Sequence, residues 1–94
     1  MNNAEIAETL EEIARLLKMK KESIYKIRAY ERAADAIRDY PQQLADIDSQ
    51  DRLKEIPGVG EAISKKLDEL LHNGKLEYLE NLKRELSGTV DGHA

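Results

Sequence analysis

Hydrophobic residues recur at helical spacing along most of the chain. Between residues 4 and 18 they are separated by four, three and four positions, at Ile6, Leu10, Ile13 and Leu17. This spacing places them on one face and predicts an amphipathic helix over 4–18.

A second helix is predicted over residues 24–39. Ser23 can cap its start, and Pro41 stops it. Small and aromatic residues trace its expected apolar face: Tyr25, Ala29, Ala33, Ala36 or Ala34, Ile37 and Tyr40. The alanines allow close approach of a neighbouring helix. Residues 42–50 then read as a connector with about one helical turn, pinned by Leu44 and Ile47.

The stretch 53–67 predicts two short helices joined by a very tight hairpin. Pro57 disfavours helical backbone at the residue before it, so a helix ends there. Gly58 and Gly60 allow positive φ and the close approach of another backbone. Val59, between the two glycines, is placed to fill the groove between the helices.

Two further helices follow the hairpin. The first has apolar positions at Ile63, Leu67, Leu70 and Leu71 and ends at Asn73-Gly74. The last begins at Lys75, with a stripe of Leu76, Leu79 and Leu82 or Leu86. The predicted fold class is all-α, a compact bundle of four to six short helices. Residues 1–86 form one domain, and residues 87–94 are a small polar tail expected to be frayed.

Composition excludes several classes of protein. The chain has no cysteine, so disulfides and thiolate zinc sites are excluded. Its acidic, amphipathic start does not resemble a signal peptide, and no apolar run approaches the length needed to span a membrane. The expected location is cytoplasmic.

One segment is basic although the chain carries a net charge of −4. Residues 19–32 hold five cations against two glutamates: Lys20, Lys21, Lys26, Arg28 and Arg32. This distribution predicts a local anion site rather than a broad surface that coats nucleic acid.

The hairpin itself offers a second anion site. Amides of residues 58–62 lie at a helix start, where intrahelical partners are lacking, and they face a surface without side chains. A phosphate oxygen fits such a site, helped by the helix dipole. The alternative is a tight turn that only packs two helices together.

Two blocks of the sequence resemble one family. Ser23 to Ile37, with Tyr-Lys-Ile-Arg-Ala-Tyr from residue 25, resembles the second helix of the amino-terminal domain of X-family DNA polymerases. Leu53 to Leu82, with Ile-Pro-Gly-Val-Gly from residue 56, resembles the helix-hairpin-helix motif and following helices of that domain. The likeness is greatest to the bacterial and archaeal branch. It implies a sequence-independent DNA-binding domain of the base excision repair type.

The resemblance also implies roles for individual residues. Lys66 matches the Schiff-base nucleophile of a 5′-deoxyribose-phosphate lyase, and Lys26 and Tyr30 match its 5′-phosphate pocket. Lys54 matches a cation near the DNA backbone, and Tyr25 a residue that stacks on a base. The remaining DNA-binding candidates are the hairpin and nearby cations: Gly58, Val59, Gly60, Arg28 and Lys65. The backbone carbonyls of Lys54, Ile56 and Val59 match a potassium or sodium site, and no other cofactor is expected.

The chain departs from the family at two cationic positions, which are Ala62 and Tyr78 here. Fewer cations around Lys66 weaken the lowering of its pKa that a neutral amine nucleophile needs. Lys66 can also be read as a structural lysine whose stem lies along the apolar face.

Three functions therefore stay open. The leading hypothesis is a non-enzymatic module that binds gapped or nicked DNA and its 5′-phosphate. The others are a lyase and a protein-interaction domain with weak DNA affinity, which the acidic last helix supports through Glu77, Glu80 and Glu85. The expected partners are such DNA and a polymerase core or other repair proteins, and the expected state is a monomer. No polymerase activity is expected from these residues, since the palm domain and its metal-binding aspartates are absent.

Overall fold

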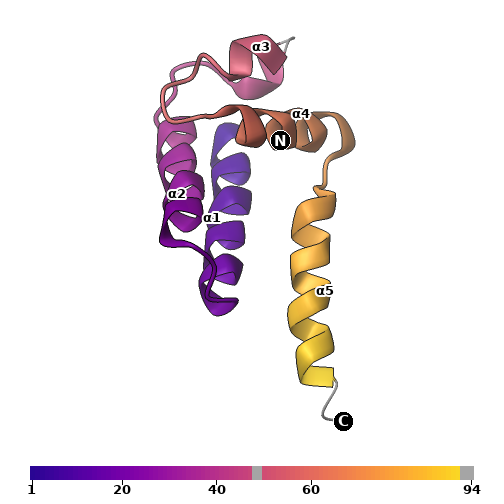
Figure 1. The fold of residues 1–94 in the computed structure, drawn as a ribbon. Coiled ribbons are helices and arrows are strands. Elements are labelled where there is room, and N and C mark those ends of the chain that lie inside the picture. Colours follow the sequence, from indigo (N-terminus) through magenta and orange to yellow (C-terminus); the bar gives the residue numbers. More distant parts are fainter. Residues whose placement is uncertain (48–49, 92–94) are drawn as a thin grey trace.

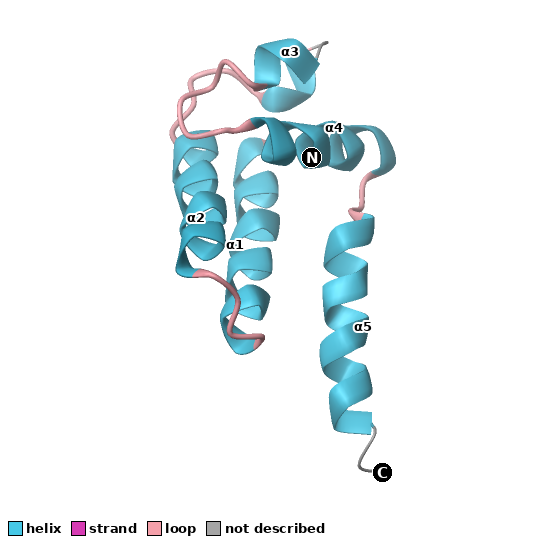
Figure 2. Ribbon diagram, viewed as in Figure 1, coloured by secondary structure: helices cyan, strands magenta, loops and turns pink. Residues whose placement is uncertain are grey.

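The computed structural model of the chain describes residues 1–47 and 50–91. Within these ranges the structure consists of helices and loops (Figure 2). The elements in chain order are α1 (Asn3–Met19), α2 (Ile24–Arg38), the 3-10 helix η1 (Leu44–Asp46), α3 (Gln50–Leu53), α4 (Glu61–Asn73) and α5 (Glu77–Asp91). The predicted all-α class is confirmed.

Helices α1 and α2 form an antiparallel pair, and the later elements are arranged around it (Figure 1). Helix α4 crosses one end of the pair, and α5 runs beside it in the direction of α1. Two ion pairs connect α5 to the α1 side: Glu85 with Lys20 at 2.7 Å, and Lys83 with Glu12 at 3.6 Å. One carboxylate of the acidic helix α5, that of Glu85, is therefore paired with a lysine of the same domain.

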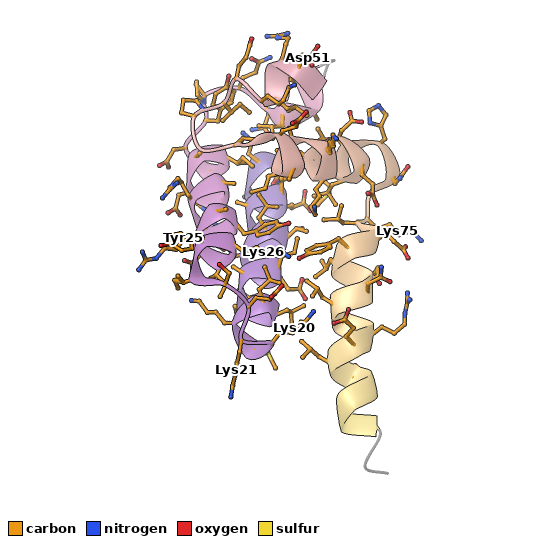
Figure 3. The ribbon with its side chains drawn as sticks, viewed as in Figure 1. Lys20, Lys21, Tyr25, Lys26, Asp51 and Lys75 are labelled. Carbon is orange, nitrogen blue, oxygen red and sulfur yellow. The ribbon has the colours of Figure 1, made fainter. Side chains whose placement is uncertain are left out.

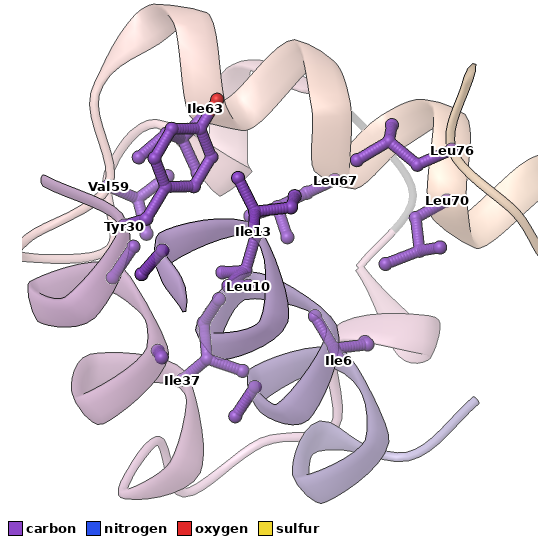
Figure 4. Packing of buried hydrophobic residues seen from close by; sticks show 14 of the residues in the cluster. Ile6, Leu10, Ile13, Tyr30, Ile37, Val59, Ile63, Leu67, Leu70 and Leu76 are labelled. Carbon is purple, nitrogen blue, oxygen red and sulfur yellow. The ribbon is translucent and has the colours of Figure 1, made fainter. Parts of the chain in front are cut away.

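The core confirms the predicted face of α1 and corrects that of α2. Ile6, Leu10, Ile13 and Leu17 are all fully buried (Figure 4). On α2 the expected anchor Tyr25 is 84% exposed, whereas Tyr30 is only 4% exposed. The buried face of α2 consists of Ile27, Tyr30, Ala33, Ala34 and Ile37. This face carries two isoleucines where the expected face carried one, and isoleucine has no polar atom that needs a partner when it is buried.

The connector is held by a side chain that sequence patterns did not single out. Asn3 is buried at the start of α1, where its Oδ1 accepts the amide of Leu44 at 2.8 Å. Its Nδ2 donates to the carbonyl of Gln42 at 2.9 Å. Leu44 and Ile47 are both buried, as predicted. These contacts fix the segment that leads into the hairpin.

The start of α2 and the end of α4 have the caps that the sequence predicts. Ser23 caps α2 by accepting the amide of Tyr25, and Gly74 takes the left-handed conformation, with φ of 74°, after α4. Helix α1 ends differently, because Lys21 is left-handed with φ of 61° although it is not a glycine.

Helix α5 differs from its predicted range at both ends. It begins at Glu77, two residues after the expected Lys75, and it continues to Asp91. Residues 87–91 of the expected tail are therefore helical, and residues 92–94 lie outside the described residues. The domain boundary at residue 86 stays a prediction. No helix in the described ranges has the length and apolar character required to cross a membrane.

Candidate nucleic-acid interface

The hairpin between α3 and α4 is a tight turn over residues 56–59. The amide of Val59 donates to the carbonyl of Ile56 at 2.9 Å, and Gly58 has φ of 92°. Proline at the second position and a left-handed glycine at the third position are typical of a type II turn. The prediction that Gly58 takes a positive φ is thereby confirmed. The turn also corrects the expected donor set, because the Val59 amide is used inside the hairpin and is not free for a ligand.

The turn is fixed against α2 by close packing. A Cβ added at Gly58 would lie 3.3 Å from Cβ of Ala36 and 3.4 Å from Cγ of Arg32. Val59 and Ile56 are buried, as expected for residues that fill the space between helices. Val59, Ile63 and Tyr30 belong to the same buried cluster (Figure 4), so the hairpin and the buried face of α2 share one core.

The start of α4 is the open part of the hairpin. Gly60 is its N-cap, and no side chain caps the helix there. The first amides of a helix have no intrahelical partner, so those of Glu61, Ala62 and Ile63 are available to a ligand. Gly60 has φ of −87°, which any residue adopts, and an added Cβ would meet nothing within 4 Å. The expected positive φ at Gly60 is therefore not observed, and its contribution is open access to the amides.

An open hollow lies at this helix start. It is lined by the hairpin and one side of α2: Ala29, Arg32, Gly58, Val59, Gly60, Glu61, Ala62 and Ile63. Arg32 brings a cation to the hollow, although it was not among the predicted DNA-binding residues. The sequence shows that Arg32 lies about one helical turn after Ala29. It does not show which face of α2 the hairpin contacts.

Four residues from three helices form a second group, here called the lysine–tyrosine cluster: Lys26, Tyr30, Lys66 and Tyr78. The rings of Tyr30 and Tyr78 are stacked, with centroids 6.2 Å apart and planes 10° from parallel. The ammonium nitrogens of Lys66 and Lys26 lie 4.7 Å and 5.8 Å from the centroid of the Tyr78 ring. Three of the four residues were predicted to share a site, and Tyr78 was counted only as a lost cation.

The cluster shifts the protonation of its members in different directions. Burial lowers the pKa of Lys66, the charge of Lys26 lowers it further, and Glu69 opposes both. The pKa of Lys26 is raised by its interaction with the Tyr78 hydroxyl and by Glu22, which lies 3.3 Å away. Burial raises the pKa of Tyr30 far above its ordinary value, so this phenol stays protonated. The cluster thus pairs one firmly charged lysine with one that loses its proton more readily.

The other predicted site residues lie apart from this cluster. Lys54 is exposed and pairs with Asp51 at 3.6 Å. Arg28 and Lys65 are exposed on α2 and α4. Figure 3 shows Tyr25 on the outer side of α2 and Lys26 on the side toward α5. Tyr25 is thus available for stacking, but it does not share a surface with Lys26.

The basic segment is partly neutralised by the chain itself. Lys20 pairs with Glu85 at 2.7 Å, and Lys26 pairs with Glu22 at 3.3 Å. A phosphate that reaches Lys20 or Lys26 must displace a carboxylate. The segment therefore offers less free charge than its composition indicates.

The monovalent cation site at the hairpin carbonyls stays a prediction. The Ile56 carbonyl accepts one hydrogen bond, from Val59, and a carbonyl oxygen has a second lone pair.

Metal sites formed by side chains are a separate question. In the described part of the chain, no three His, Cys, Asp or Glu side chains gather in a way that could hold a metal ion.

Comparison with known proteins identifies the family. A family model of the helix-hairpin-helix domain matches residues 1–76. The matched range contains the α1–α2 pair, the type II turn and the uncapped start of α4, and it ends just before α5. Backbone amides at an open helix start suit phosphates rather than bases, in keeping with this match. The chain therefore belongs to the helix-hairpin-helix domain family and is a DNA-binding domain of this kind.

Proposed function

We propose that the domain binds DNA at gaps and nicks and holds the 5′-phosphate end in the lysine–tyrosine cluster. The observation that carries this proposal is the convergence of Lys26 and Lys66, from two different helices, on the ring of Tyr78. Two ammonium groups held against one neutral surface suit a ligand with two negative charges.

A terminal phosphate differs from an internal one in charge. A phosphate monoester carries about 1.5 to 2 negative charges near neutral pH, as on phosphorylated side chains. An internal phosphodiester carries one, and the neutral amides at the start of α4 suit it. The hairpin would then hold the DNA backbone while the cluster takes the 5′ end. Binding would be independent of base sequence, with a salt slope of about −0.9 per phosphate neutralised.

Membership of the amino-terminal domain of X-family DNA polymerases is part of this proposal. Its support is the resemblance over Ser23–Ile37 and Leu53–Leu82, together with the meeting of Lys26, Tyr30 and Lys66 around one ring. On this proposal a potassium or sodium ion would sit at the carbonyls of Lys54, Ile56 and Val59. A repair role and a polymerase core as partner would follow from the same membership.

The test compares gapped duplex DNA with and without a 5′-phosphate in the gap. The wild-type protein should bind the phosphorylated form more tightly, and Lys26→Ala should remove this preference. Lys75→Ala is the matched control, because Lys75 is an exposed lysine on the far side of α5 from Lys26 (Figure 3). Equal losses from the two variants would mean that only diffuse charge is at work, and equal binding of both DNAs by the wild type would refute 5′-phosphate recognition.

The second candidate function is a 5′-deoxyribose-phosphate lyase, and the environment of Lys66 favours it. Burial and the charge of Lys26 lower the pKa of Lys66, so a larger share of its amine is neutral than for an exposed lysine. In this reaction the neutral amine adds to the sugar aldehyde at C1′, and loss of water leaves a Schiff base. A 5′-phosphate held at Lys26 would present the sugar to Lys66.

Borohydride trapping on DNA with an incised abasic site tests this activity. A covalent adduct that persists in Lys65→Ala and is lost in Lys66→Ala would establish Lys66 as the nucleophile. Lys65 is the appropriate control because it is the neighbouring lysine on α4 and is exposed. Absence of an adduct in the wild type, on DNA shown to be bound, would leave a binding module alone.

A further inference from the structure

Tyr78 is the residue at which the cluster is assembled, and it lies outside the matched range 1–76. The ammonium nitrogens of Lys66 and Lys26 lie 4.7 Å and 5.8 Å from the centroid of its ring, and the ring stacks on Tyr30. We propose that Tyr78 is a positioning residue of the anion site, holding both lysine ammonium groups where one terminal phosphate can reach them. This inference rests on the proposed function and assigns a part in it to α5.

The ring can do this because it attracts cations without neutralising them. Two ammonium groups repel each other and would otherwise move apart into water. The negative face of an aromatic ring favours a cation lying over it, and a tyrosine adds a hydroxyl at its edge. The ammonium nitrogens of Lys66 and Lys26 both lie over the ring, and the hydroxyl also raises the pKa of Lys26. A carboxylate in the same place would also gather the lysines, but it would cancel the charge that a phosphate needs.

The contrast is visible at Lys26, which has both kinds of neighbour. Glu22 pairs with Lys26 at 3.3 Å and must give way when an anion binds. Tyr78 need not move, since a phosphate can approach the ammonium groups from outside the ring. Lys20, by contrast, pairs with Glu85 at 2.7 Å. Tyr78 thus faces cations from α2 and α4.

The ring is itself fixed on several sides. Tyr30, against which it stacks, is 4% exposed and belongs to the core. The flanking Leu76 and Leu79 are buried, and the carboxylate of Glu69 on α4 accepts the amide of Glu77 at 2.9 Å. The first turn of α5 therefore has little freedom. The lysines are arranged by a ring whose own position is set by α2 and α4.

Two substitutions separate the contributions of the ring and the hydroxyl. Tyr78→Phe keeps the ring for both lysines and removes only the hydroxyl, which raises the pKa of Lys26. Tyr78→Leu removes both and keeps an apolar side chain of moderate size. Two properties are measured on each: the side-chain NMR signals of the lysines without DNA, and the ratio of dissociation constants for gapped DNA with and without a 5′-phosphate.

In the wild type we expect the ε-methylene protons of Lys66 to show an aromatic ring-current shift. Tyr78→Phe should keep that shift, lower the pKa of Lys26 and reduce the 5′-phosphate preference only in part. Tyr78→Leu should abolish the shift and reduce the preference about tenfold, the scale expected when two cation–ring contacts are lost.

The NMR measurement tests the positions of the lysines without DNA, so its result does not depend on DNA binding. If the wild type shows no ring-current shift at Lys66, the positioning role is refuted whatever the DNA result. The same holds if Tyr78→Leu stays folded and keeps the full 5′-phosphate preference. If the lysines respond as expected but the wild type does not distinguish the two DNAs, the positioning of the lysines is supported and the proposed function fails.

Discussion

The guanidinium of Arg38 binds both carboxylate oxygens of Glu11, at 2.9 and 3.0 Å, and so joins the end of α2 to the middle of α1. Two parallel charge-assisted hydrogen bonds fix both side chains in orientation as well as in distance. The hydrogen bonds from Arg38 lower the pKa of Glu11 below its ordinary value of 4.5.

This contact makes part of the stability dependent on pH. In the unfolded chain Glu11 titrates near its ordinary pKa, and in the folded protein it titrates lower. The contribution is complete above the ordinary value and is lost as the pH falls through the lowered one. Glu11→Gln should therefore reduce the free energy of unfolding at pH 7, and the deficit should vanish in strong acid. Urea unfolding across this range measures it, with Glu55→Gln, a change at an exposed glutamate, as the control. A deficit independent of pH would contradict the assignment.

Gly58→Ala should destabilise the domain by roughly 1–3 kcal/mol. The residue has φ of 92°, where a side chain is strained, and the new Cβ would lie 3.3 Å from Cβ of Ala36. Thermal or urea unfolding measures the loss. Unchanged stability would mean that the turn between α3 and α4 adopts another backbone conformation.

Gly60→Ser should separate stability from DNA binding. Its backbone suits any residue, and serine at an N-cap is favoured over glycine by a few tenths of a kcal/mol. The new hydroxyl accepts an amide at the start of α4, and it then competes with a phosphate for that donor. We expect unfolding at or slightly above the wild-type midpoint and weaker binding to duplex DNA. Full affinity in this variant would exclude the α4 amides from the interface.

Lys21→Gly should stabilise the domain by about 1 kcal/mol, because Lys21 occupies the left-handed region with φ of 61°. Its amide donates to the carbonyl of Lys18 at 3.0 Å, and the same turn is kept by glycine. For a domain of this size the midpoint should rise by about 4–8 °C. Lys21→Ala has the same loss of charge without the release of strain, and it should not show the gain.

Local chemistry explains which parts of the fold were predictable. The stripe of Ile6, Leu10, Ile13 and Leu17 contains only large aliphatic residues, so one face of α1 dominates. On α2 two overlapping stripes have helical spacing. The predicted buried face was drawn through the alanines, and it therefore wrongly included Tyr25 in place of Tyr30. The stripe that the core buries is the one that contains the second isoleucine, Ile27.

The candidate site likewise has features that the sequence predicts and features that it does not. The left-handed Gly58 follows from a proline–glycine pair within a single turn, so the sequence carries it directly. The meeting of Tyr78 with Lys26 requires α5 to run back beside the α1–α2 pair, which residue spacing does not determine. The free amide expected at Val59 was wrong for a related reason, since the partner of that amide depends on the turn type.

The stacked pair of Tyr30 and Tyr78 also gives the protein an internal optical reporter. The chain has four tyrosines and no tryptophan or phenylalanine, so its near-ultraviolet circular dichroism comes from tyrosine alone. Near-ultraviolet signals require fixed tertiary surroundings, whereas far-ultraviolet signals follow helix content. Undocking of α5 with its helix intact would therefore change the first signal and leave the second nearly constant.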